Sequence, residues 1–148
     1  MKNLTLEANQ LIEGVSFSFP SFKLTEQEII DFALLLDPQK IHIDKAFAEA
    51  SMFGGIISSG AHPYHVAHKK YWIPLAEKTF LCGLYIRNWD FLAPIYPEKE
   101  IHPTYSIIKV NPSVKGNTAE VQWLLEFFDS EKNLLQSLDV GVLHSIKG

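Results

Sequence analysis

An aspartate and a histidine five residues apart are the first candidates for chemistry in this sequence. Asp37 precedes Pro38, and His42 follows after Gln39-Lys40-Ile41. Carboxylates and imidazoles are general acid–base groups, so such a pair could move protons at one water molecule. In a regular helix the two side chains would point about 140° apart, and in a strand they would face opposite sides. They can meet only if the chain bends between them, and Pro38 supplies a bend.

A glycine-containing segment, Phe53-Gly54-Gly55-Ile56-Ile57-Ser58-Ser59-Gly60, follows this pair. Its first two glycines allow positive φ or a close backbone approach. Ser58 and Ser59 are good N-cap residues for a helix that opens at Gly60. The first N–H groups of such a helix have no intrahelical partner and could hold a negative charge. A dinucleotide-binding loop is not favoured, because no strand–loop–helix unit with a following acidic residue surrounds the glycines.

The composition predicts an ordinary globular domain that spans residues 1–148. Hydrophobic residues make up 47% of the chain and charged residues 20%, which is typical of such domains. The net charge of −4 and the absence of a basic stripe argue against a nucleic-acid partner. The single Cys82 cannot form an internal disulfide, which suits a reducing compartment.

The sequence shows no sign of membrane insertion or export. Its first residues contain no continuous apolar run of the signal-peptide kind, and no apolar stretch approaches the roughly 20 residues that cross a bilayer. We therefore expect a cytoplasmic protein with no membrane partner.

The first third of the chain predicts one strand and two helices. Residues 1–10 are expected to form a loosely held end, and the alternation over Val15–Phe19 indicates a half-buried strand. Thr25-Glu26-Gln27-Glu28 forms a capping box that starts a helix over 26–36, which ends at Asp37 because a proline follows. A short helix over 44–52 should have Asp44 as its N-cap and turn three side chains inward, namely Ala46, Phe47 and Ala50.

The remainder of the chain predicts one long helix followed by a sheet. Apolar and aromatic residues from Gly60 to Lys78 indicate a central helix, which Pro74 should kink or end. Four segments rich in β-branched and aromatic residues then follow, separated by turn signals: 79–94, 100–110, 118–129 and 134–146. Long strands joined by short loops predict an antiparallel sheet, so the fold class is α+β with the sheet packed around the helix.

These residues resemble the MaoC-like dehydratase family, which includes the (R)-specific enoyl-CoA hydratases. The resemblance implies the hotdog fold, a curved antiparallel sheet wrapped around one long helix. Three positions depart from the family pattern: Gln39-Lys40 replaces Asn-Pro, His68 or a neighbour replaces a small hydroxyl residue, and Pro97-Glu98-Lys99 replaces Pro-Gly-Asp. The first part of the motif comprises Asp37, Pro38, Gln39, His42, Asp44, Ala50, Ser51, Phe53, Gly54, Gly55, Ile57, Ser59, Gly60 and His62, and the second comprises residues 87–94.

The resemblance implies reversible hydration of a 2-enoyl thioester carried by coenzyme A or an acyl carrier protein. In this interpretation Asp37 activates the water, His42 orients it and relays the proton to C2, and the Gly60 amide holds the oxyanion. A separate group is predicted to contact the substrate: Gly55, Ser59, His62 and Trp89. No metal or redox cofactor is implied, and long sheet edges favour a homodimer or a dimer of dimers.

Other interpretations stay open from the sequence. An Asp-Pro pair is usually only a turn. Aromatic residues such as Tyr64, Trp72, Trp89 and Phe91 are more often core than ligand-binding groups, although some could line an acyl tunnel. Three histidines, His62, His65 and His68, could lie on a helix surface or line a pocket, and no carboxylate or cysteine completes a zinc site with them. The phosphates of coenzyme A could meet Lys69, Lys70, Arg87 or Lys109. A hotdog thioesterase and a non-catalytic subunit that supports an active partner chain are the alternative functions.

Overall fold

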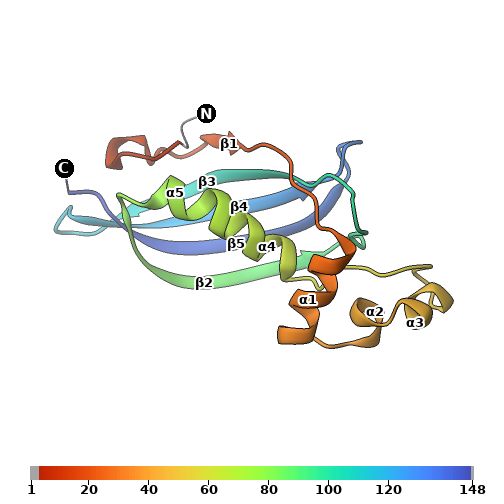
Figure 1. The fold of residues 1–148 in the computed structure, drawn as a ribbon. Coiled ribbons are helices and arrows are strands. Elements are labelled where there is room, and N and C mark those ends of the chain that lie inside the picture. The colour runs from red at the N-terminus through yellow and green to blue at the C-terminus, as the bar shows by residue number, and fades with distance from the viewer. Residues whose placement is uncertain (1–3, 148) are drawn as a thin grey trace.

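The computed structural model describes residues 4–147, in which a curved antiparallel sheet wraps around one helical rod (Figure 1). The strand order across the sheet is β1-β3-β4-β5-β2, and each neighbouring pair is antiparallel. The helical elements are η1 (Ala8–Gln10), α1 (Glu26–Leu36), α2 (Lys40–Ile43), α3 (Lys45–Ala50), α4 (His62–Ala67), η2 (His68–Trp72) and α5 (Ile73–Ala76). The strands are β1 (Ser16–Ser18), β2 (Phe80–Phe91), β3 (His102–Pro112), β4 (Thr118–Phe128) and β5 (Leu134–Ser145).

The sheet confirms the predicted α+β class and the four long strand segments. Along β4, buried side chains alternate with half-buried or exposed ones, so one face of the strand turns toward the helical rod. The strand expected over Val15–Phe19 is shorter than predicted, because only Ser16–Ser18 pair with β3. Register shifts in the β2–β5 pair occur at three points along the strands, and such irregularities increase the local twist and curvature of a sheet.

The predicted central helix is present as three consecutive segments, α4, η2 and α5. The middle segment is π-helical, so the rod does not end at Pro74 but continues to Ala76. Proline has no N–H to donate and clashes with the carbonyl four residues before it in an α-helix. A wider π turn directly before Pro74 relieves this conflict, which is a recognised cause of local helix distortion.

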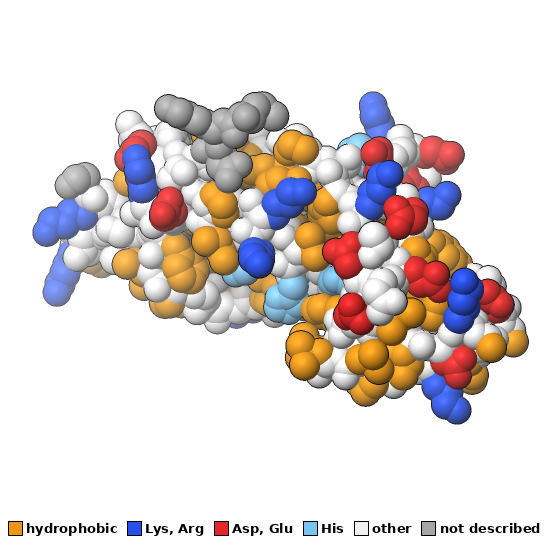
Figure 2. Space-filling model, in the orientation of Figure 1, with side chains coloured by type: hydrophobic (Ala, Val, Ile, Leu, Met, Phe, Trp, Pro, Cys, Tyr) orange, Lys and Arg blue, Asp and Glu red, His pale blue; other side chains and the backbone are white. Residues whose placement is uncertain are grey.

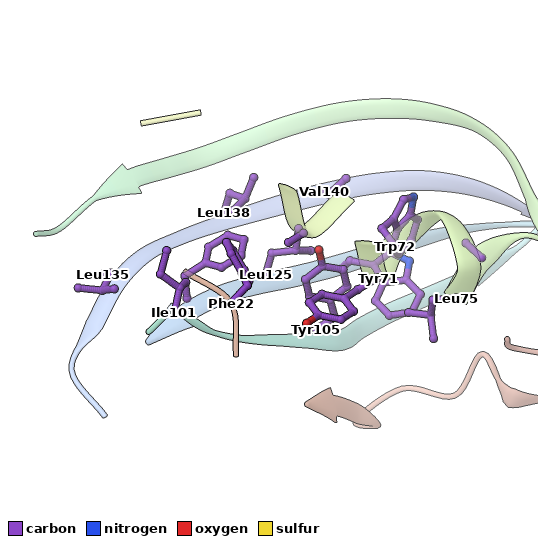
Figure 3. Close-up of a cluster of buried hydrophobic side chains, with 14 of the residues drawn as sticks. Phe22, Tyr71, Trp72, Leu75, Ile101, Tyr105, Leu125, Leu135, Leu138 and Val140 are labelled. Atoms are coloured by element: carbon purple, nitrogen blue, oxygen red, sulfur yellow. The ribbon is translucent and has the colours of Figure 1, made fainter. Parts of the chain in front are cut away.

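The core lies between this rod and the concave face of the sheet. Trp72 of η2 packs edge-on against Trp123 of β4, with ring centroids 4.9 Å apart. Figure 3 shows Tyr71, Trp72 and Leu75 of the rod pointing toward Tyr105 and neighbouring strand residues. Burial of large aromatic side chains is a major source of stability, so this contact fixes the rod on the sheet.

Residues 4–10 are held more firmly than the predicted loose end. Leu6 is 1% exposed, and its N–H donates to the carbonyl of Leu75 at 2.8 Å. The predicted loose end was therefore wrong for residues 4–10, because Leu6 is buried and its backbone is bonded to α5. Residues 1–3, which belong to the same predicted end, lie outside the described residues.

Helices α1, α2 and α3 form an arm, residues 26–50, that projects beyond the end of the sheet (Figure 1). The capping box of α1 is confirmed by reciprocal bonds of 3.1 Å between Thr25 and Glu28. The predicted cap of α3 is also confirmed, since Asp44 accepts from the N–H of Phe47 at 3.0 Å. Hydrophobic side chains remain on the surface of the arm (Figure 2), and they include Leu34, Leu35 and Leu36.

The inward face predicted for α3 is wrong. Ala46, Phe47 and Ala50 are exposed, and Ala48 is the buried residue of this helix. A six-residue helix at the periphery buries about one side chain, so its apolar residues are too few for their spacing to predict which face is buried. None of the helices within residues 4–147 is long and apolar enough to cross a membrane.

A buried histidine lies at the opposite end of the fold from the arm. His144 is 0% exposed, and its Nε2 accepts from the indole N–H of Trp123 at 3.1 Å. Because indole only donates, Nδ1 carries the proton and donates to the hydroxyl of Thr79 at 2.9 Å. Burial lowers the pKa of His144 from 6.5 to about 4, so the folded protein keeps this ring neutral.

We predict that His144 makes the fold sensitive to acid. Below pH 6.5 the unfolded chain binds a proton at this residue while the folded chain does not, so stability falls toward pH 4. The expected loss is about 1.4 kcal/mol per pH unit. Urea unfolding at pH 7.5, 6 and 5 measures it. His144→Gln should be less stable at pH 7.5 but less sensitive to pH, whereas the surface variant His102→Gln should keep most of the wild-type dependence. Equal pH slopes in all three proteins would contradict the prediction.

Candidate active site

The arm brings the sequence-predicted acid and histidine together. Asp37 is the C-cap of α1 and has left helical geometry, with φ −156° and ψ 67°. The chain turns at once, with the N–H of Gln39 donating to the carbonyl of Asp37 at 2.7 Å. Helix α2 then places His42 so that its Nε2 lies 3.4 Å from Oδ2 of Asp37. The bend at Pro38 is therefore sufficient for the two side chains to meet.

The ring of His42 is fixed by a backbone contact. Its Nδ1 lies 2.8 Å from the carbonyl oxygen of Ile57, and the side chain is buried. A carbonyl only accepts, so Nδ1 carries a proton and donates to it. Nε2 is therefore the ring nitrogen that faces the Asp37 carboxylate.

A cavity of about 400 Å³ opens beside this pair. The cavity wall combines polar side chains with a larger number of apolar ones. Gly60, whose amide the sequence singled out, is on the wall together with Asp37 and His42. The full lining is Asp37, Gln39, His42, Phe53, Ile57, Ser58, Gly60, Phe91, Leu92, Ala93, Pro94, Ile95 and Gln136.

Comparison with known proteins places the chain in a family. Residues 9–123 match the family described as MaoC like domain. The chain belongs to the MaoC-like domain family. A protein named uncharacterized protein YdeM, from Bacillus subtilis (strain 168), is 28% identical over 112 residues, which is 72% of this chain and 77% of that protein.

Solved structures show the same hotdog fold. The MaoC-like dehydratase from Rhodospirillum rubrum superimposes with a TM-score of 0.85 at 23% identity, over 97% of this chain and 99% of that one. The (R)-hydratase from A. caviae, described as involved in PHA biosynthesis, superimposes with a TM-score of 0.70 at 18% identity, over 90% and 96% of the two chains. The fold implied by the sequence resemblance is thereby confirmed.

In this MaoC-like domain the start of the central helix differs from the prediction. Helix α4 begins at His62 with Ala61 as its N-cap, and no side chain caps it. Ser58 and Ser59 therefore do not cap the helix, and their buried hydroxyls have no hydrogen-bond partner within residues 4–147. Gly60 lies two residues before the helix, and its N–H donates to no other described residue.

Four residues predicted to contact substrate lie off the cavity wall. Gly55 is half-buried in the loop before α4, and Ser59 is buried directly before Gly60. His62 stacks on Phe32 of α1 with centroids 4.2 Å apart. Trp89 of β2 donates its indole N–H to the side-chain oxygen of Gln136 at 3.3 Å. Contact of these four residues with a substrate stays a prediction.

The sequence reasoning missed Gln136 and Ser58 as cavity residues, whereas Phe91 was among the aromatic residues considered for an acyl tunnel. For Gln136 a signal was present, because it occupies an inward position of β5 between Leu134 and Leu138, where alternation calls for an apolar residue. Phe91 explains the glycine at position 60. A Cβ on Gly60 would lie 2.5 Å from Cζ of Phe91, closer than such atoms approach in proteins.

The histidines of the central helix do not assemble a metal site. Burial lowers the pKa of both His62 and His68; Glu28 partly opposes the shift at His62, and His65 adds to both shifts. Within residues 4–147 no group of three or more His, Cys, Asp or Glu residues is placed to hold a metal ion. The basic candidates for coenzyme A phosphates also lie off this cavity wall, and Arg87 instead covers the ring of Tyr85 at 4.0 Å.

We predict that Gly60→Ala destabilises the fold through Phe91. The added methyl must displace the Phe91 ring, and such overpacking costs about 1–3 kcal/mol. Urea unfolding of a double-mutant cycle with Phe91→Ala measures the coupling. In the Phe91→Ala background the same Gly60→Ala change should be neutral or slightly stabilising, because it then only restricts the unfolded chain. An equal cost in both backgrounds would show that the ring is not the obstacle.

Proposed function

We propose that this MaoC-like domain catalyses the reversible addition of water to a 2-enoyl thioester to give a 3-hydroxyacyl thioester. The observation that carries the proposal is the acid–histidine pair itself. Nε2 of His42 and Oδ2 of Asp37 lie 3.4 Å apart, and both residues line one cavity. A carboxylate and an imidazole in this arrangement can act as general acid–base groups on one water molecule, which is a reactant of the proposed reaction.

The proposed reaction removes one proton from water and delivers one proton to C2. Asp37 takes a proton from the water as its oxygen forms the bond to C3, while His42 keeps the water oriented through Nε2. The same proton then passes through His42 to C2, so the product gains one hydroxyl and one hydrogen and no electrons are transferred. General acid–base groups of this kind contribute roughly 10²–10⁴-fold to a rate. Dehydration follows the reverse path.

Negative charge that develops on the thioester oxygen also needs a donor. The N–H of Gly60 is suited to this role because Gly60 lines the cavity and its N–H donates to no other described residue. A preorganised backbone N–H stabilises such charge without reorganisation during the reaction. The apolar part of the wall, which includes Ile57 and Leu92, suits an acyl chain.

The carrier of the acyl group is proposed to be coenzyme A or an acyl carrier protein, as part of the substrate. We propose that no metal or redox cofactor takes part, because the addition of water is redox-neutral and the proposed pair supplies the proton transfers. We also propose a homodimer or a dimer of dimers. Support comes from β2, which is an outermost strand of the sheet and exposes Leu81, Leu84 and Ile86.

We predict that Asp37→Asn abolishes hydration. The amide retains the shape of the side chain but cannot accept the proton, so kcat should fall by about 10²–10⁴-fold. Loss of enoyl-thioester absorbance with crotonyl-CoA and with longer or branched enoyl-CoAs measures the activity. Asp31→Asn is the matched control, because Asp31 lies on the exposed face of α1 and bonds only Gln27 among the side chains described. Full activity in Asp37→Asn would overturn the assignment.

The same samples test the alternative functions. Release of free thiol without loss of the alkene would show a thioesterase, in which the held water attacks the thioester carbonyl. A protein that is inert alone and active only after a second chain is added would show a supporting subunit. Either result would replace the hydratase proposal.

We predict that a charge in the centre of β2 weakens self-association. Leu84 is 42% exposed, and Leu84→Lys would bring two like charges into an interface between copies of this strand. Light scattering after gel filtration measures the mass. Val114→Lys, in the β3–β4 turn, is the matched control and should keep the wild-type mass. An unchanged mass in Leu84→Lys would place the interface elsewhere.

A further inference from the structure

A glutamine connects the sheet to the segment that precedes the central helix. Gln136 lies on β5 beside Phe91 of β2, and it is 2% exposed. Its Nε2 donates to the carbonyl of Gly60 at 2.9 Å. Its Oε1 accepts from the indole N–H of Trp89 at 3.3 Å. A buried amide whose oxygen and NH₂ group both have partners links two parts of the structure through specific hydrogen bonds.

The two partners leave one orientation for the amide. The indole N–H of Trp89 can only donate, so the oxygen of the Gln136 side chain faces it. The NH₂ group must then face the carbonyl of Gly60, which can only accept. Trp89 therefore selects the orientation in which Gln136 is a donor at the cavity wall.

The carbonyl of Gly60 depends on this donor. The first bond of α4 runs from the N–H of His65 to the carbonyl of Ala61 at 3.1 Å, which is one residue further along. No other described residue donates to the Gly60 carbonyl. Glycine has the widest backbone freedom of any residue, so the Gln136 bond is the hydrogen bond that restrains this carbonyl.

We infer that Gln136, oriented by Trp89, is a positioning residue that holds the Gly60 backbone at the cavity wall. This inference rests on the proposed function, in which the N–H of Gly60 holds the oxyanion. Gln136 touches the carbonyl of Gly60 and not the reacting atoms. It acts by fixing the glycine whose N–H meets the developing charge. Trp89 then contributes to this positioning through its bond to Gln136.

The kinetic test uses Gln136→Met, which keeps the length of the side chain and removes both hydrogen bonds. We expect kcat for hydration to fall about tenfold or more while KM stays within about twofold, because the oxyanion contact strengthens only in the transition state. Gln136→Glu, assayed at pH 8, should lose as much, since a carboxylate still accepts from Trp89 but cannot donate to Gly60. Gln122→Met on β4 is the matched control and should keep wild-type values. A kcat within twofold of wild type in Gln136→Met would overturn the inference.

The structural test does not need activity. Backbone ¹⁵N relaxation of Gly60 and Ala61 should give order parameters near about 0.85 in the wild type and below about 0.6 in Gln136→Met. Circular dichroism of both variants checks that the sheet is intact. Unchanged order parameters would overturn the inference. If the wild type hydrates none of the thioesters, the proposed function fails, and the relaxation comparison alone then supports or overturns the positioning of Gly60.

Discussion

The hydrogen bond from Nδ1 of His42 to the carbonyl of Ile57 is the contact on which the site depends. It joins α2, in the arm, to the chain that enters the central helix. It also directs Nε2, the other ring nitrogen, toward Asp37. The neighbouring bond from the N–H of Ile57 to the carbonyl of Ile41 reinforces the same junction. One backbone carbonyl thus sets both the place and the orientation of the imidazole.

Much of the architecture could be predicted from local sequence. The capping box at Thr25, the cap at Asp44 and the four long strands follow from side-chain chemistry within a few residues, and the structure confirms them. The approach of Asp37 and His42 was also accessible, because a proline between them limits the possible backbone paths.

Features that depend on distant partners were out of reach of local sequence. The N–H of Leu6 bonds the carbonyl of Leu75, which is distant in the chain, and α4 begins at His62 without a side-chain cap that local sequence could have indicated. The role of Gln136 depends on Trp89 and Gly60, which lie 47 and 76 residues away in the chain. A polar residue such as Gln136 at an inward-facing strand position indicates that the site is unusual, but only the tertiary structure shows which groups it bonds.

The peripheral position of the arm has a consequence for how the protein fails. The arm carries Asp37 and His42, yet few of its residues are buried, and Leu34, Leu35 and Leu36 face outward. The sheet and the rod share a large core rich in aromatic side chains, to which the arm contributes Ile29 and Ala48. Proteins open in units whose free energies follow such differences in burial. We therefore expect mild denaturant to open the arm, and with it the acid–histidine pair, before the sheet unfolds.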